Sequence, residues 1–300
     1  MKVNDILKEN SKDDSKDHLY QAIIDGYYFQ NYLKPIYDRY LKNEKSSDSN
    51  SIETALHNEN LMKELSKHYI LHGMFDKEYS NKVLTFKYRK QPKDTLKFIH
   101  NYVNELSKEK LGEAVRSLLF LTKELSEATE YGSFYAFFPI DECEFYYNPN
   151  ISDFTITFDA QNLFKFHEFY DEPIKKSDKT MPFRKQIMEY ILENDDITLS
   201  KDSVEKVKKY IYSIYQDFGL DENYADYIAR YVEKRIEYFR DKVINYIGFI
   251  KKTDSIASIP EEGEVMAKPN RFILLPTIGS EDDVFVPLGK YYFENYIKEQ

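Results

Sequence analysis

The chain has 300 residues, of which 42% are apolar and 16% aromatic, and it carries a formal net charge of -10. The 27 Tyr and 21 Phe supply enough large apolar surface for a packed core, which excludes a disordered chain. The negative charge argues against broad nonspecific binding of DNA or RNA, because phosphate contacts need clustered Lys and Arg.

Cysteine content and the N-terminal residues indicate the compartment. Cys143 is the sole cysteine, so neither an internal disulfide nor a thiolate zinc cluster is expected. The first residues, Met1 to Asp17, are polar, and no stretch approaches the roughly 18 apolar residues of a membrane span. We therefore expect a cytoplasmic protein that makes no membrane contact.

The first 130 residues are predicted to form an all-helical lobe. Apolar residues recur at helical spacing, with a bend or break at Pro35 in the first stretch and a stop at Gly73 in the second. The predicted helices are His18 to Lys45, Ile52 to His72, Pro92 to Leu106, and Leu111 to Leu125. The polar run Asn43 to Asn50 is expected to be an exposed loop.

The central residues change to short aromatic runs, which predicts an antiparallel β meander. The predicted strands are Phe134 to Ile140, Glu144 to Tyr147, Phe154 to Phe158, and Leu163 to Phe169. The third shows the clearest alternation of apolar and polar residues.

The remaining chain is predicted to form long helices and a β hairpin. The helices are Phe183 to Glu193, Ser203 to Phe218, Asn223 to Lys251 and a closing Tyr291 to Ile297, and the hairpin pairs Arg271 to Ile278 with Val284 to Leu288. The fold class is therefore predicted as α+β, with a helical lobe over residues 1–130 and an α+β lobe over residues 131–300.

The stretch Lys67-His68-Tyr69-Ile70-Leu71-His72-Gly73 is the most specific local motif. Within the predicted helix over 52–72, His68 and His72 are expected at i and i+4 on one face, a spacing that can chelate a metal. No third ligand and no His-Glu-x-x-His pattern accompany them, so we expect structural histidines and no metal site.

This stretch resembles the Arg-His-x-Ile-Leu-His-Gly segment of bacterial abortive-infection proteins related to HEPN ribonucleases. The resemblance implies metal-independent RNA cleavage, with His72 in acid/base chemistry and Lys67 near the scissile phosphate. Lys67 stands where that family has Arg, so the charge is kept while the planar fork that grips phosphate oxygens is lost.

A second candidate region is acidic and aromatic. Residues Tyr131 to Glu172 contain four Asp and four Glu against one Lys, a net charge of -7. We expect this surface to bind a basic protein partner. Its predicted binding residues are Asp141, Glu142, Glu144, Tyr146 and Tyr147, with solvated strand edges as the simpler interpretation.

Motifs for common cofactors are missing from the sequence. It has no Gly-x-Ser-x-Gly elbow, phosphate-binding Gly-rich loop or dinucleotide fingerprint, and Cys143 lies among carboxylates that disfavour a thiolate. We therefore expect no cofactor. The predicted function is a macromolecule-binding protein, for instance in phage–host conflict, and the alternative is a degenerate HEPN-like ribonuclease acting on RNA.

Overall fold

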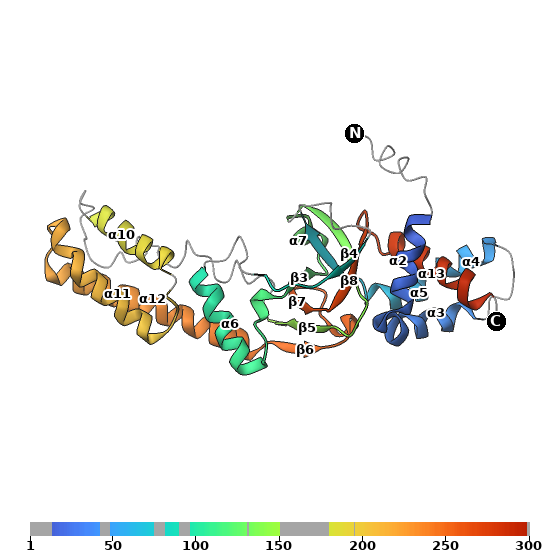
Figure 1. Cartoon of the computed structure of the whole chain (residues 1–300), viewed down its shortest axis with the longest axis horizontal. Helices are drawn as coiled ribbons and strands as arrows, with labels where there is room; N and C mark the ends of the chain where they lie inside the picture. The colour runs from blue at the N-terminus through green and yellow to red at the C-terminus, as the bar shows by residue number, and fades with distance from the viewer. Residues whose placement is uncertain are drawn as a thin grey trace, which may run out of the picture. The chain divides into compact units, whose positions relative to one another are not determined.

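The computed structural model describes residues 14–42, 49–74, 82–89, 97–130, 132–150, 180–194 and 196–298. These residues form an antiparallel sheet with helices before and after it along the chain, which confirms the predicted α+β class (Figure 1). Within the described ranges, none of the helices combines the length and apolar character that crossing a bilayer requires.

The chain divides into two compact units. Unit 1 comprises residues 1–87, 119–149 and 251–300, and unit 2 comprises residues 88–118 and 150–250. Both units are thus built from segments distant in sequence, and their boundaries differ from the single division at residue 130 that the sequence suggests.

The sheet belongs to unit 1. Its eight described strands are β1 (Leu71–Met74), β2 (Val83–Thr85), β3 (Leu119–Thr122), β4 (Ser133–Pro139), β5 (Glu144–Tyr147), β6 (Lys251–Thr253), β7 (Glu264–Lys268) and β8 (Arg271–Pro276). Their order is β2-β8-β4-β1-β3-β7-β5-β6, and neighbouring strands run antiparallel. β4 and β5 confirm two predicted strands, whereas residues 154–158 and 163–169 lie outside the described ranges.

The helices of unit 1 come mostly from the two ends of the chain. They are α2 (Asp14–Asp25), the π-helix η1 (Phe29–Leu33), α3 (Lys34–Leu41), α4 (Ser49–Leu56), α5 (Glu59–Ser66), α7 (Leu125–Glu130), η5 (Ile256–Ser258), α13 (Asp282–Tyr292) and the π-helix η6 (Phe293–Ile297). A continuous core joins these helices to the sheet, and it contains Leu19, Leu121, Phe137 and Phe285, each at most 1% exposed.

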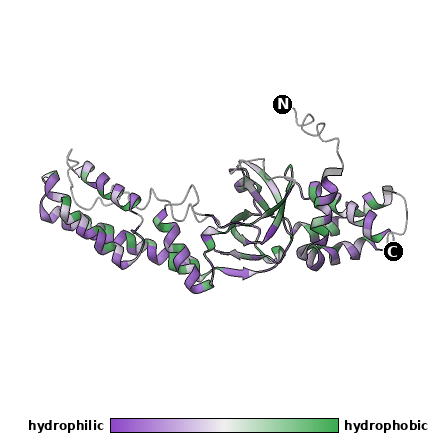
Figure 2. Cartoon of the chain, viewed as in Figure 1, coloured by the Kyte–Doolittle hydropathy of each residue, from purple (hydrophilic) through white to green (hydrophobic). Residues whose placement is uncertain are grey.

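Unit 2 is helical in its described part. It contains α6 (Lys97–Leu111), η3 (Val115–Ser117), α10 (Thr180–Glu193), α11 (Lys201–Ile214), η4 (Tyr215–Phe218) and α12 (Glu222–Gly248). Asp221 caps α12 by accepting a hydrogen bond from the Tyr224 amide. The predicted apolar stripe of α12 is buried from Ile228 to Tyr246. Figure 2 shows hydrophobic and hydrophilic residues alternating along α11 and α12, as amphipathic helices require.

The prediction that residues 1–130 contain only helices is wrong, because β1, β2 and β3 fall within them. The predicted helix over 52–72 is divided at Asn58, which caps α5, and it ends at Ser66. The apolar run expected to be helical over 111–125 instead supplies strand β3, whose residues are mostly buried. A short run that is buried on both sides fits a strand as well as a helix.

The predicted strand over Val284 to Leu288 is also wrong, because these residues lie in α13. β8 pairs with β2 and β4 instead of forming the expected hairpin. The consecutive apolar residues of this segment favour a strand. Pro287 argues against a central strand, because it lacks the amide proton that strand pairing needs. Pro287 instead lies inside α13, which lacks the intrahelical hydrogen bond that an amide at this position would donate.

Two glycines mark the closest approaches between helices and their neighbours. A Cβ on Gly26 would lie 3.0 Å from the Ile140 carbonyl oxygen, and the adjacent Tyr27 amide donates to that same oxygen over 2.6 Å. A Cβ on Gly289 would lie 2.6 Å from both Leu56 and the buried Tyr37 ring. The absence of side chains at these positions therefore sets how closely α2 approaches the end of β4, and how closely α13 approaches α3 and α4.

We predict that Gly289→Ala destabilises the protein although alanine favours helix. Helix propensity alone would stabilise by about 1 kcal/mol, but overpacking a filled core costs about 1 to 3 kcal/mol. The matched control is Gly248→Ala at the end of α12, where an added Cβ meets nothing within 4 Å. Urea unfolding should show a net loss for the first variant and no loss for the second; equal stability of both would contradict the packing argument.

Candidate functional site

The motif Lys67 to Gly73 spans the end of a helix and the start of a strand. Lys67 is the C-cap of α5, and β1 begins at Leu71. The expectation that His68 and His72 share one helical face is therefore wrong. Strand pairing overrides the helical pattern here, because His72 lies in register with Tyr135 of β4 and its backbone belongs to the sheet.

His68 is a buried structural residue. Its Nδ1 lies 2.8 Å from the Tyr28 hydroxyl, and that hydroxyl accepts from the Ile256 amide over 3.0 Å. Because an amide can only donate, the Tyr28 hydroxyl donates its own proton to His68 Nδ1. Nδ1 is then an acceptor, so the single N–H of the neutral imidazole is on Nε2. The rings of Tyr28 and Tyr32 lie 5.9 and 6.3 Å from the imidazole.

Burial lowers the pKa of His68 to about 4, and the nearby Lys123 and Lys67 charges act in the same direction. His68 is therefore neutral at pH 7. Burial also raises the pKa of Tyr28 far above its usual value, so the phenol stays protonated. Tyr28 and His68 therefore form a hydrogen bond between two neutral groups at pH 7.

The two residues implied by the HEPN resemblance lie on different elements. Lys67 is exposed at the end of α5, and its carbonyl accepts from Lys123 Nζ over 3.1 Å. His72 is half-buried on β1, with Nδ1 2.8 Å from the Phe120 carbonyl oxygen. That carbonyl can only accept, so Nδ1 carries a proton and the lone pair of the neutral ring is on Nε2.

Lys123 is the buried cation beside this motif, with a side chain only 3% exposed. Its ammonium donates to the carbonyls of Lys67 and Ile259 and lies 3.6 Å from the Glu261 carboxylate. Burial lowers its pKa, and Glu261 opposes that shift. These contacts hold the end of α5 against the segment that precedes β7.

Across the described ranges, no group of three or more His, Cys, Asp or Glu side chains is placed to hold a metal ion. Cys143 is buried, and this burial raises its thiol pKa well above the usual range. A protonated, inaccessible thiol is a poor nucleophile.

Most residues predicted to bind a partner are engaged within the fold. Arg271 donates to both oxygens of Asp141 over 2.6 and 2.9 Å, and Lys252 pairs with Glu144 at 2.5 Å. Each cation lowers the pKa of its carboxyl partner. Charges neutralised in this way contribute little to long-range attraction of a partner.

The two predicted tyrosines of β5 are also occupied. Tyr146 is 3% exposed, and its hydroxyl donates to Glu144 over 2.8 Å. Tyr147 is half-buried and donates to the Ser258 carbonyl over 3.3 Å. Of the five predicted residues, Glu142 alone is exposed and forms no ion pair with a described residue.

The fold places other residues beside Glu142. Asp254, Tyr27 and Glu142 all act electrostatically on Tyr32 and raise its pKa. Burial is the largest cause and the Asp254 carboxylate the next, and together they raise the pKa of Tyr32 to about 12. We name Tyr27, Tyr32, Glu142 and Asp254 the acidic tyrosine patch.

Two hydrogen bonds donated by backbone amides, one to a carbonyl and one to the Tyr28 hydroxyl, assemble this patch. The bond from the Tyr27 amide to Ile140 brings η1 next to the turn that carries Glu142. The bond from the Ile256 amide to Tyr28 brings the segment with Asp254 next to Tyr32. Sequence reasoning missed Tyr27, Tyr32 and Asp254 because these contacts join residues more than a hundred positions apart.

No protein-family model, curated protein or solved structure matches the chain.

We predict that His68 makes stability depend on pH. Its folded pKa of about 4 lies below the unfolded value of 6.5, so the unfolded state binds more protons, and stability present above pH 6.5 is lost as the pH falls toward 4. At pH 4.5 this linkage amounts to about 2 to 3 kcal/mol.

Urea unfolding of the native chain and His68→Gln at pH 7 and pH 4.5 measures this contribution. The variant should lose less stability between the two pH values. His18→Gln, at an exposed histidine, serves as the control and should follow the native chain. Parallel pH profiles for native and His68→Gln proteins would show that His68 is not the linked group.

Proposed function

We propose that this chain binds a protein partner with a basic surface through the acidic tyrosine patch. The observation that carries this proposal is the pair of exposed carboxylates, Glu142 and Asp254, that form no ion pair with any described residue and adjoin two tyrosine rings. Tyr27 is 39% exposed and Tyr32 is partly exposed, so both rings offer contact area.

The chemistry of the patch favours protein over nucleic acid. Tyrosine provides a large amphipathic surface at a low cost in side-chain entropy, and it is enriched at protein interfaces. Uncompensated carboxylates attract Lys and Arg and repel phosphate, so they favour encounter with a basic protein surface. The local charge acts together with the net charge of -10 of the whole chain.

The preorganisation of the patch supports the same proposal. The start of η1 is held by the buried hydrogen bonds of the Tyr28 hydroxyl with His68 and with the Ile256 amide. A partner therefore meets side chains whose freedom is already reduced, and the entropy cost of binding falls. A role in phage–host conflict remains a further expectation for this binding activity.

The ribonuclease alternative stays a prediction and has a direct test. Purified chain is incubated with mixed RNA in the presence of a metal chelator, alongside His72→Ala and Lys67→Ala. Cleavage abolished by either substitution would support the alternative. Cleavage that persists unchanged in both variants would assign it to other residues or to a contaminant.

We predict that Glu142→Gln with Asp254→Asn slows association with basic peptides. The probes are Lys- and Arg-rich peptides containing a tyrosine, and association rates are measured at low and high ionic strength. At low salt the double variant should associate roughly three- to tenfold more slowly, because electrostatic steering is lost, and high salt should remove the difference.

Two further variants locate the effect. Glu262→Gln with Asp217→Asn changes the net charge equally at exposed sites outside the patch and should leave the rate nearly unchanged. Asp141→Asn with Arg271→Gln removes both members of an ion pair, leaves the net charge unchanged and should also have a small effect. An equally slow rate for Glu262→Gln with Asp217→Asn would mean that net charge and not the patch sets the association rate, and tight binding of RNA would count against a protein partner.

A further inference from the structure

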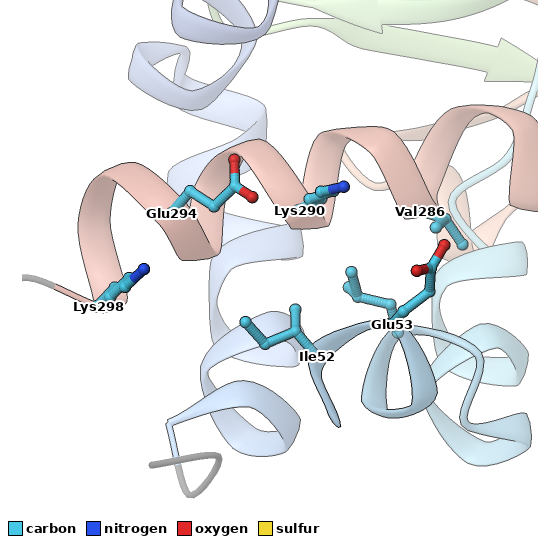
Figure 3. Close-up of a pocket in the computed structure, with 7 residues that line it drawn as sticks. Ile52, Glu53, Val286, Lys290, Glu294 and Lys298 are labelled. Carbon is cyan, nitrogen blue, oxygen red and sulfur yellow. The ribbon is translucent and has the colours of Figure 1, made fainter. Parts of the chain in front are cut away.

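A small apolar hollow lies between α4 and α13, and it is separate in sequence and composition from the acidic tyrosine patch. Its apolar lining comes from Ile52 and Leu56 of α4 and from Val286 of α13. Figure 3 shows Ile52 and Glu53 reaching from α4 toward α13, with Lys290, Glu294 and Lys298 spaced along the helix above them.

The size of the hollow limits what can occupy it. Its volume is about 70 Å³. Sites for cofactors and drug-sized ligands usually measure about 300 to 1,000 Å³, and one water takes about 30 Å³ of liquid. The hollow is therefore too small for a nucleotide, and its size suits one aliphatic side chain.

The rim supplies charges of alternating sign. Lys290, Glu294 and Lys298 follow one another at four-residue intervals, and Glu53 lies on the opposite helix. All four side chains are exposed, and none forms an ion pair with a described residue. Glu294 lies within the π-helix η6, and π-helical turns are frequent at functional sites. A row of unpaired charges beside an apolar hollow matches the polar rim and apolar centre of a protein interface.

From this arrangement we propose that the hollow seats one aliphatic side chain of an amphipathic helix from a protein partner. The partner helix carries acidic, basic and acidic residues at four-residue intervals, which face Lys290, Glu294 and Lys298 in turn. Docking of a helix along a groove, with an apolar anchor and complementary charges, is an established mode of peptide recognition. The rim is charge-balanced, so order of charge and not net charge selects the partner.

Helical peptides test this directly. The probe is an Ala-rich peptide with Glu, Lys and Glu at successive four-residue intervals and one Leu beside the central Lys, and its affinity is measured by fluorescence anisotropy. Replacing that Leu by Ala should weaken binding by roughly fiftyfold, since about three carbons leave the apolar site. Replacing it by Asp should abolish binding.

Charge reversal identifies the rim. Lys290→Glu with Lys298→Glu should weaken binding of the probe by at least roughly tenfold, and a peptide with both Glu replaced by Lys should recover it. Both lysines are exposed, so the variant should fold normally. Lys201→Glu with Lys209→Glu, at exposed positions of α11, is the matched control and should bind the original probe as the native chain does.

Three results would overturn the proposal. One is the absence of binding by any peptide of the series up to about 1 mM, a range that already admits weak contacts. Another is equal affinity of the Leu and Asp peptides. The third is a concentration-dependent dimer of the native chain that the double charge reversal dissociates, which would make a second copy the occupant.

Discussion

The hydroxyl of Tyr28 is the contact on which the arrangement of unit 1 depends. It joins His68, 40 residues away, and the Ile256 amide, 228 residues away, in one buried cluster. Removing the Tyr28 hydroxyl would leave the His68 Nδ1 and the Ile256 amide buried without this partner, at a cost of about 1 to 3 kcal/mol for each group. The cluster thereby fixes η1, the end of α5 and the turn before β7 to one another.

The acidic tyrosine patch is a surface consequence of this buried cluster. Tyr27 and Tyr32 flank Tyr28 on the same turn, and Asp254 precedes Ile256 by two residues. The tight approach at Gly26 and Ile140 adds Glu142 from the other side. The exposed residues of the patch are brought together by the buried contacts of Tyr28 and Gly26 beneath them.

The sequence predicts those elements whose local pattern and tertiary environment agree. α12 keeps one apolar stripe and a clear cap, and β4 and β5 are aromatic runs bounded by turn residues, so all three were predicted correctly. β1 and β3 were missed because short apolar runs fit helix and strand equally well, and the choice depends on sheet partners distant in the chain. The predicted strand over Val284 to Leu288 was wrong for the same reason. In so short a segment, the apolar residues favoured a strand more strongly than Pro287 argued against it.

The candidate site shows a different limit of sequence reasoning. Counting charges over residues 131–172 identifies an acidic region, but the field at a surface depends on which carboxylates the fold neutralises. Arg271 pairs with Asp141 and Lys252 with Glu144, and both cations come from strands more than a hundred residues later. Glu142 lies between these two carboxylates in sequence and forms no such pair with a described residue, and Asp254, two positions after Lys252, adjoins the same tyrosine. Strand pairing thus divides the acidic stretch into carboxylates that pair with cations of β6 and β8, and carboxylates that form no ion pair with a described residue.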